Sequence, residues 1–234
     1  MTISTLEHRQ RSKLDETLFL ENGDRLTRAE FERRYSAHPE IEKAELIEGV
    51  VYMSSPVRLG HGRPHSYLMY WLTSYCAATP GVDVGDNVTV RLDEDNEFQP
   101  DALLRLDPRV GGRSRVSEDD FIEGPPELVA EVAVSSASYD LHGKLNVYRR
   151  AGVQEYVVWP VFEKRLEWFE LREGQYVPLT AAADGLLYSR VFPGLALLPE
   201  ALLAGDLARV LAALQTGLAR PEHAAFLDRL RSAT

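Results

Sequence analysis

The clearest pattern of hydrophobic and polar positions lies between residues 127 and 160. In the segment 127–135 every second residue is apolar, and this period of two predicts a strand. One face of that strand carries Leu128, Ala130, Val132 and Val134. Residues 138–152 follow with a helical pattern that ends at Gly152, a residue suited to a left-handed helix cap. Because the apolar run 154–160 predicts a second strand, this part of the chain is expected to form a strand–helix–strand unit.

Other segments repeat these patterns. Further strands are expected in 43–55, with Gly49 in a turn or bulge, in 82–106 around a polar turn at 93–97, and in a hairpin at 165–180. Helices are expected at 26–35, where Thr27 and Glu30 form a capping box, at 62–78, and as a pair after Pro199. Hairpins combined with a strand–helix–strand unit predict an α/β fold with a mixed sheet flanked by helices. The expected division is an arm at 1–25, a main domain at 26–198 and a C-terminal helical extension at 199–234.

Composition and charge narrow the class of protein. A chain of 234 residues that is 44% hydrophobic suits one globular domain with a sizeable core. The apolar runs fall short of the about 18 residues of a membrane span, and the polar start does not resemble a secretion signal. The single cysteine, Cys76, excludes an intrachain disulfide and a cysteine-cluster zinc site, which fits a reducing cytoplasm. A net charge of −10 argues against sequence-blind coating of nucleic acid but is compatible with a local basic groove.

Two carboxylates interrupt apolar segments. Asp101 follows Pro100, a residue that favours a strand start or a sheet edge, and Glu131 lies on the second face of its predicted strand. Burying an unpaired carboxylate is costly, so each acid needs compensation. Pairing with an arginine or capping a backbone N–H is one explanation for each acid. A divalent cation shared by two acids at the ends of neighbouring strands is the other.

A lysine on the following helix adds to this pattern. Asp140 and Lys144 are four residues apart, a spacing that also forms surface salt bridges worth only tenths of a kcal/mol. The short connection between strand and helix is expected to place the first helical turns beside the C-terminal end of the strand. In that case the stem of Lys144 can lie along the apolar face while its ammonium reaches Glu131.

Taken together, these segments resemble a known family. The motifs FQPDALL (98–104), PPELVAEVAVSSASYDLHGKLNVYRRAGVQEYVVW (125–159) and AELIEGVVYMSSP (44–56) are similar to those of the Uma-two family of predicted endonucleases. That family belongs to the PD-(D/E)XK, or restriction-endonuclease-like, superfamily, and the resemblance covers roughly residues 26–197. It implies a central mixed sheet flanked by helices, Mg²⁺ or Mn²⁺ as the cofactor, and phosphodiester hydrolysis of nucleic acid, most simply DNA.

The resemblance also implies roles for individual residues. Asp101 and Glu131 would bind the metal, helped by the backbone carbonyl of Val132. The lysine expected two residues after Glu131 is absent, since the chain has Ala133 there, and Lys144 would take its place by orienting water or stabilising the transition state.

Further site residues are implied with open alternatives. Glu45 matches the early acidic residue of the family, with Glu48 as its rival. His61 matches a histidine that follows the SSP turn at the end of the motif 44–56, with His65 as its rival, although a lone histidine at a helix start is more often a cap or surface group. Supporting contacts are expected from Asp140 and Tyr148. Phosphate contacts beside Asp101 are expected from an arginine-rich loop, unless that loop is simply solvated; the four residues are Arg105, Arg109, Arg113 and Arg115.

Two other functions fit the same sequence. One is a catalytically degenerate nuclease fold used as a binding or assembly module, which the acidic surface favours. The other is a hydrolase of small phosphoesters, for which the negative charge is a smaller obstacle than for duplex DNA. The aromatic runs 67–75 and 165–171 exceed what one domain is expected to cover, so a homodimer is predicted as well.

Overall fold

The computed structural model describes residues 19–54, 56–134 and 143–232. Contacts divide the chain into a smaller unit, formed by residues up to 55 together with 92–99, and a larger unit, formed by 56–91 and the residues from 100 onward. This division differs from the predicted arm, domain and extension. The smaller unit includes an internal segment, 92–99, and the C-terminal helices belong to the larger unit.

The smaller unit consists of one helix and a small sheet. Its elements are α2 (Arg28–Ser36), β1 (Ala44–Ile47), β2 (Val50–Met53) and β5 (Asn96–Phe98), with β1 paired to both other strands. The side chain of Thr27 accepts a hydrogen bond from the backbone N–H of Glu30, so the predicted helix start is confirmed. Glu48 and Gly49 have positive φ angles of 51° and 73°, as a tight turn between β1 and β2 requires.

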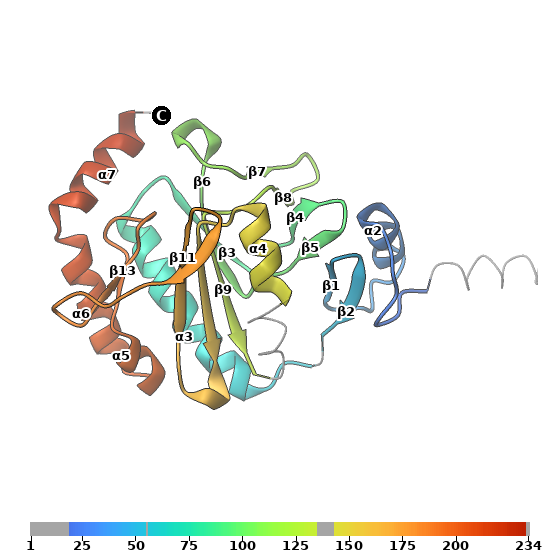
Figure 1. The fold of residues 1–234 in the computed structure, drawn as a ribbon, viewed down its shortest axis with the longest axis horizontal. Helices are drawn as coiled ribbons and strands as arrows, with labels where there is room; N and C mark the ends of the chain where they lie inside the picture. Colours follow the sequence, from blue (N-terminus) through green and yellow to red (C-terminus); the bar gives the residue numbers. More distant parts are fainter. Residues whose placement is uncertain (1–18, 55, 135–142, 233–234) are drawn as a thin grey trace, which may run out of the picture. The chain divides into compact units, whose positions relative to one another are not determined.

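The larger unit is built around a six-stranded mixed sheet in the order β12-β11-β10-β9-β6-β3 (Figure 1). Its strands are β3 (Val82–Asp86), β6 (Ala102–Leu106), β9 (Leu128–Ala133), β10 (Glu155–Pro160), β11 (Glu167–Arg172) and β12 (Gln175–Pro178). β9 and β10 run parallel, as expected for a strand–helix–strand unit, and the other neighbours are antiparallel.

Shorter elements lie between these strands and the helices of the chain. They are β4 (Val90–Asp93), η1 (Pro108–Val110), β7 (Arg115–Val116), β8 (Ile122–Glu123), η3 (Val161–Glu163), β13 (Leu187–Tyr188) and β14 (Ala196–Leu197). The segment 82–106, predicted as two strands, thus contains β3, β4, β5 and β6. The polar residues between β4 and β5 form the expected turn, while the two further breaks were not visible in the apolar pattern.

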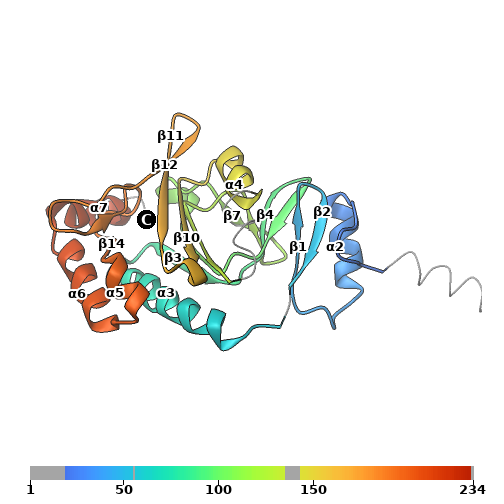
Figure 2. The same cartoon turned by 60° about the horizontal axis from the view of Figure 1, so that its bottom comes forward.

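Helices cover both faces of this sheet (Figure 2). α3 (Leu59–Ala78) lies on one face, and α4 (Leu145–Ala151) lies on the other, where the Tyr148 and Tyr156 rings are 5.2 Å apart. Gly152 caps α4 with φ of 86°, as predicted. The C-terminal segment forms three helices rather than two: α5 (Pro199–Ala204), α6 (Leu207–Leu218) and α7 (Pro221–Ser232).

The core of the larger unit lies on the α3 face of the sheet. It combines the buried residues of α3, such as Trp71, with Leu104, Ala130 and Val157 from the strands. Leu214 and Phe226 from the C-terminal helices belong to the same core, which is why these helices are not a separate extension.

The aromatic runs behind the predicted homodimer are mostly covered within one chain, although Tyr70 is 39% exposed. Trp71 and Tyr75 of the first run and Trp168 of the second are at most 2% exposed. The homodimer therefore stays a prediction but loses this reason. Among the described residues, none of the helices combines the length and the apolar composition that crossing a bilayer requires.

Candidate active site

The two acids singled out from the sequence lie on neighbouring strands. Asp101 immediately precedes β6, and Ala102 pairs with Ala130 of the antiparallel strand β9, so this register continues with Asp101 opposite Glu131. Ala102 and Ala130 point into the core. Because side chains alternate along strands, Glu131 faces the other side of the sheet, while Asp101 lies at the start of β6, where its carboxylate meets the backbone of Val132. Both are only 4% exposed.

The carboxylate of Asp101 is held by a backbone amide and a histidine. The N–H of Val132 donates to Oδ2 of Asp101 at 2.7 Å, and Nε2 of His61 lies 3.2 Å from the same oxygen. His65 contacts the backbone of Asp101 instead, since its Nε2 donates to the carbonyl oxygen at 2.9 Å. Of the two rival histidines, His61 is therefore the one that contacts the acid. The metal-binding role predicted for the carbonyl of Val132 stays a prediction.

The carboxylate of Glu131 is held from α4 and the residue that precedes it. Nζ of Lys144 donates to Oε1 of Glu131 at 2.9 Å, and the hydroxyl of Tyr148 donates to the same oxygen at 3.0 Å. The side chains of Lys144 and Glu131 are only 7% and 4% exposed. Lys144 thus reaches Glu131 as expected, although it directly precedes α4 instead of lying within the helix, whereas Asp140 lies outside the described residues.

The surroundings explain how each buried charge is compensated. Glu131 has Lys144 and a hydroxyl, and Asp101 has an amide and an imidazole, so neither carboxylate is buried without donors. The result is a set of hard oxygen donors beside a fixed positive charge at one end of β6 and β9. Such a set can bind a cation and stabilise negative charge on a phosphate.

The early acid predicted from the resemblance belongs to the smaller unit. Glu45 lies in β1, is 7% exposed and accepts a hydrogen bond at 2.9 Å from the backbone N–H of Gln99. Its rival Glu48 is exposed in the β1–β2 turn. The site role of either acid stays a prediction. Among the described residues, no group of three or more histidine, cysteine, aspartate or glutamate side chains is arranged to hold a metal ion.

The structure corrects the placement of the four arginines beside Asp101. Arg105 lies within β6, where its buried guanidinium donates to Asp83 at 2.6 Å and to Ser114 at 3.2 Å. It is thus a buried strand residue rather than part of a loop, and it has no exposed guanidinium to offer a phosphate.

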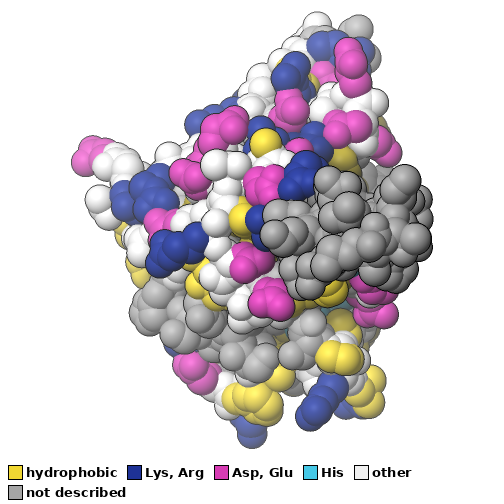
Figure 3. Space-filling model, turned by 90° about the vertical axis from the view of Figure 1, so that its right-hand side faces the viewer, with side chains coloured by type: hydrophobic (Ala, Val, Ile, Leu, Met, Phe, Trp, Pro, Cys, Tyr) yellow, Lys and Arg dark blue, Asp and Glu magenta, His cyan; other side chains and the backbone are white. Residues whose placement is uncertain are grey.

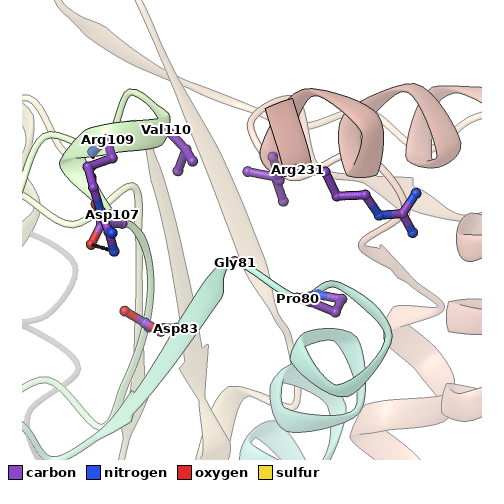
Figure 4. A pocket seen from close by; sticks show the side chains of 8 residues that line it. Pro80, Gly81, Asp83, Asp107, Arg109, Val110 and Arg231 are labelled. Carbon is purple, nitrogen blue, oxygen red and sulfur yellow. Dashed lines mark hydrogen bonds and ion pairs between the residues drawn. The ribbon is translucent and has the colours of Figure 1, made fainter. Parts of the chain in front are cut away.

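The other three arginines follow the far end of β6, about 20 Å along the chain direction from Asp101. Arg109 pairs with Asp107 at 2.9 Å and Arg115 with Glu123 at 2.6 Å, while Arg113 donates to the carbonyl of Gly152. Arg109 lines a hollow of about 470 Å³ together with Asp83, Asp107 and Arg231 (Figure 4). This hollow lies at the opposite end of the β3–β6 pair from Asp101.

Two further buried carboxylates show that burial alone does not identify the site. Glu127 accepts from the backbone N–H groups of Leu106 and Arg113, both at 2.8 Å, and burial raises its pKa. Glu155 is fully buried, and burial raises its pKa to about 7. Four donors contact it: Nε1 of Trp168, the hydroxyl of Ser189, and the backbone N–H groups of Arg190 and Val191. These acids anchor loops, whereas Glu131 contacts a lysine.

One contact that holds the site could not be read from the sequence. The amide that holds Asp101 belongs to the backbone of Val132, which gives no residue signal. The hydrogen bond from Tyr148 to Glu131 agrees with the supporting contact that the resemblance implied for Tyr148.

Comparison with known proteins adds the family. The model of the Uma2 family, described as "Putative restriction endonuclease", matches residues 28–202. The crystal structure of a "putative nuclease belonging to DUF820" from Anabaena variabilis ATCC 29413 is similar at 13% identity and a TM-score of 0.50, covering 68% of this chain and 90% of that chain.

At this identity the structural likeness shows the fold alone, and it confirms the predicted restriction-endonuclease-like class. No curated protein matches the chain. The family match spans most of the chain and includes Asp101, Glu131 and Lys144. This protein therefore belongs to the Uma2 family.

Proposed function

We propose that this protein is a metal-dependent nuclease that hydrolyses phosphodiester bonds and that its active site contains Asp101, Glu131 and Lys144. One observation carries the proposal: two buried carboxylates, one of them paired with a buried lysine, lie at the same end of the neighbouring strands β6 and β9. Membership of a family described as putative restriction endonucleases supports it.

The residues present fit a magnesium or manganese ion. Mg²⁺ is usually bound by one or two carboxylates, with water and substrate phosphate completing its ligands, so two protein acids are sufficient. Asp101 and Glu131 would hold the ion, together with the carbonyl of Val132. When bound, the ion supplies Lewis-acid charge that activates water and stabilises the phosphate in the transition state.

Each neighbouring side chain has a task in this proposal. The ammonium of Lys144, which is hydrogen-bonded to Glu131, would orient the attacking water or neutralise charge that builds on the phosphate oxygens. Tyr148 fixes Glu131 from the same direction, and His61 together with the amide of Val132 fixes Asp101. In hydrolysis, water forms a new bond to phosphorus, the bond to one bridging oxygen breaks, and that oxygen leaves with a proton.

A substrate panel tests the proposal. Supercoiled plasmid, single-stranded DNA, RNA and a small phosphodiester are each incubated with Mg²⁺, Mn²⁺ or EDTA. The proposal expects cleavage of at least one nucleic acid with metal and none with EDTA. Cleavage of the small phosphodiester alone would support the small-molecule hydrolase instead.

A Mn²⁺ titration separates a nuclease from a degenerate binding module. The native protein is expected to bind Mn²⁺, and Asp101→Asn to lose at least about tenfold in affinity, since a ligand carboxylate is removed. A native protein that neither binds Mn²⁺ nor cleaves any member of the panel would contradict the proposed function.

A further inference from the structure

Two exposed segments border the end of the sheet where Asp101 and Glu131 lie. One is the start of α3, whose N-cap is Arg58 and whose His61 contacts Asp101. The other is η3, which directly follows β10 and contacts α3. Figure 1 shows the start of α3 and the connection after β10 together at the lower end of the larger unit.

Exposed apolar side chains gather on these segments. Phe162 of η3 is 78% exposed, and Leu59 of α3 is 71% exposed. Val158 is the register partner of Glu131, so Phe162 lies only four residues beyond it, at most about 14 Å along the strand direction. Single exposed apolar residues are common, so their exposure alone does not indicate a ligand.

The charges on the same segments are the second observation. Arg109, Arg115 and Arg165 each pair with a carboxylate, as most exposed arginines of the larger unit do. In contrast, Arg58, Arg63 and Lys164 are exposed and form no ion pair with any carboxylate in the described part of the chain.

The nearby acids are already compensated. Glu163 pairs with Arg165 at 2.6 Å, and Asp86 lies 3.1 Å from His65. Over the face in Figure 3 acidic and basic side chains are interspersed, but hydrophobic and basic side chains lie next to each other at its lower end. Uncompensated positive charge therefore accompanies the exposed apolar residues, in a chain with a net charge of −10.

We infer that this rim, formed by Arg58, Leu59, Arg63, Phe162 and Lys164, binds single-stranded nucleic acid beside the candidate active site. Phe162 stacks on a base, and the three cations contact phosphates. Proteins that bind single strands combine aromatic platforms with positive charge in this way, and bases are available for stacking where they are unpaired. The inference rests on the proposed function, because the rim presents a strand to that site.

Fluorescence anisotropy with labelled thymidine oligonucleotides tests the rim. The titrations are made in EDTA, so that no hydrolysis takes place, with deoxyribose and ribose strands and a duplex as separate arms. Phe162→Ala is expected to weaken single-strand binding about tenfold, and Phe162→Trp to preserve it. The double variant Arg58→Ala/Arg63→Ala is expected to reduce the salt dependence of log affinity by about 1.4, whereas Phe162→Ala leaves it unchanged.

Matched controls come from the same unit. Val116→Ala removes a 52% exposed apolar side chain, and Arg109→Ala removes a 72% exposed arginine, both away from the rim. Both are expected to bind within about twofold of the native protein. Melting temperatures of all variants verify that they are folded.

The outcomes separate this inference from the proposed function. Three outcomes each overturn the rim. They are unchanged single-strand affinity in Phe162→Ala, a larger loss of affinity in Arg109→Ala than in the rim variants, and preference of the native protein for the duplex. If the native protein cleaves with Mg²⁺ while its rim variants bind normally, only the rim is wrong. If strands bind through the rim but are never cleaved, only the proposed hydrolysis is wrong.

Discussion

The buried pair of Lys144 and Glu131 leads to a stability prediction. Replacing Lys144 by methionine keeps much of the side-chain volume but leaves the carboxylate of Glu131, which is 4% exposed, without its ammonium. Breaking a buried ion pair in this way costs about 3–5 kcal/mol. For a chain of this length that corresponds to a fall of about 6–20 °C in melting temperature. A surface pair of Lys144 with Asp140 would instead contribute well under about 1 kcal/mol.

Denaturant unfolding at neutral pH measures this cost. Lys164→Met is the matched control, because Lys164 is an exposed lysine and its replacement is expected to stay within about 0.5 kcal/mol of the native protein. The double variant Glu131→Gln/Lys144→Met is expected to lose less than the two single variants combined, since neither charge is then left alone. If Lys144→Met unfolds within about 0.5 kcal/mol of the native protein, the buried pair is refuted.

Three other predictions test the account. Because burial raises the pKa of Glu155 from 4.5 to about 7, the folded chain keeps a proton that the unfolded chain releases. Its contribution to stability should therefore fall by up to about 3 kcal/mol as pH rises through that window, and Glu155→Gln should remove the dependence in pH-series unfolding. Arg105→Met should destabilise the fold by about 2 kcal/mol or more, because the hydrogen bonds to Asp83 and Ser114 are lost. The salt dependence of strand binding should stay unchanged in this variant, since a decrease would mean that Arg105 contacts phosphate. The predicted homodimer requires light scattering at tens of micromolar to give twice the mass of the chain, and the monomer mass rejects it.

Period-two and helical patterns predicted most of the larger unit. β9, β10, the β11–β12 hairpin and α3 all lie where the apolar pattern places them, and β9, β10, β11 and α3 contribute buried residues to the same core. The pattern could not reveal that 82–106 is broken into four strands. It also could not show that the C-terminal helices share this core, since that depends on contacts with residues more than 100 positions away.

The candidate site was predictable where a charge interrupts an apolar strand. Asp101 and Glu131 stand out for this reason. Lys144 contacts Glu131 as expected, but β9 ends at Ala133 and α4 begins at Leu145, so Lys144 precedes the helix instead of lying within it. For the arginines, proximity to Asp101 in the sequence does not correspond to proximity in space. β6 carries the chain away from Asp101, so Arg109 and Arg115 end up at its far end, where each pairs with a local acid.

The most direct test of the central claim is the single-turnover rate of nucleic-acid cleavage with Mg²⁺ in Asp101→Asn. Asparagine can still accept the hydrogen bond from Val132, so the variant should fold while losing the charge of the proposed metal ligand. Asp83→Asn is the control, because it changes a carboxylate of the same sheet that pairs with Arg105. We predict a fall of at least about 100-fold for Asp101→Asn and a change within about threefold for the control. Undiminished cleavage by folded Asp101→Asn would contradict the assignment of this site.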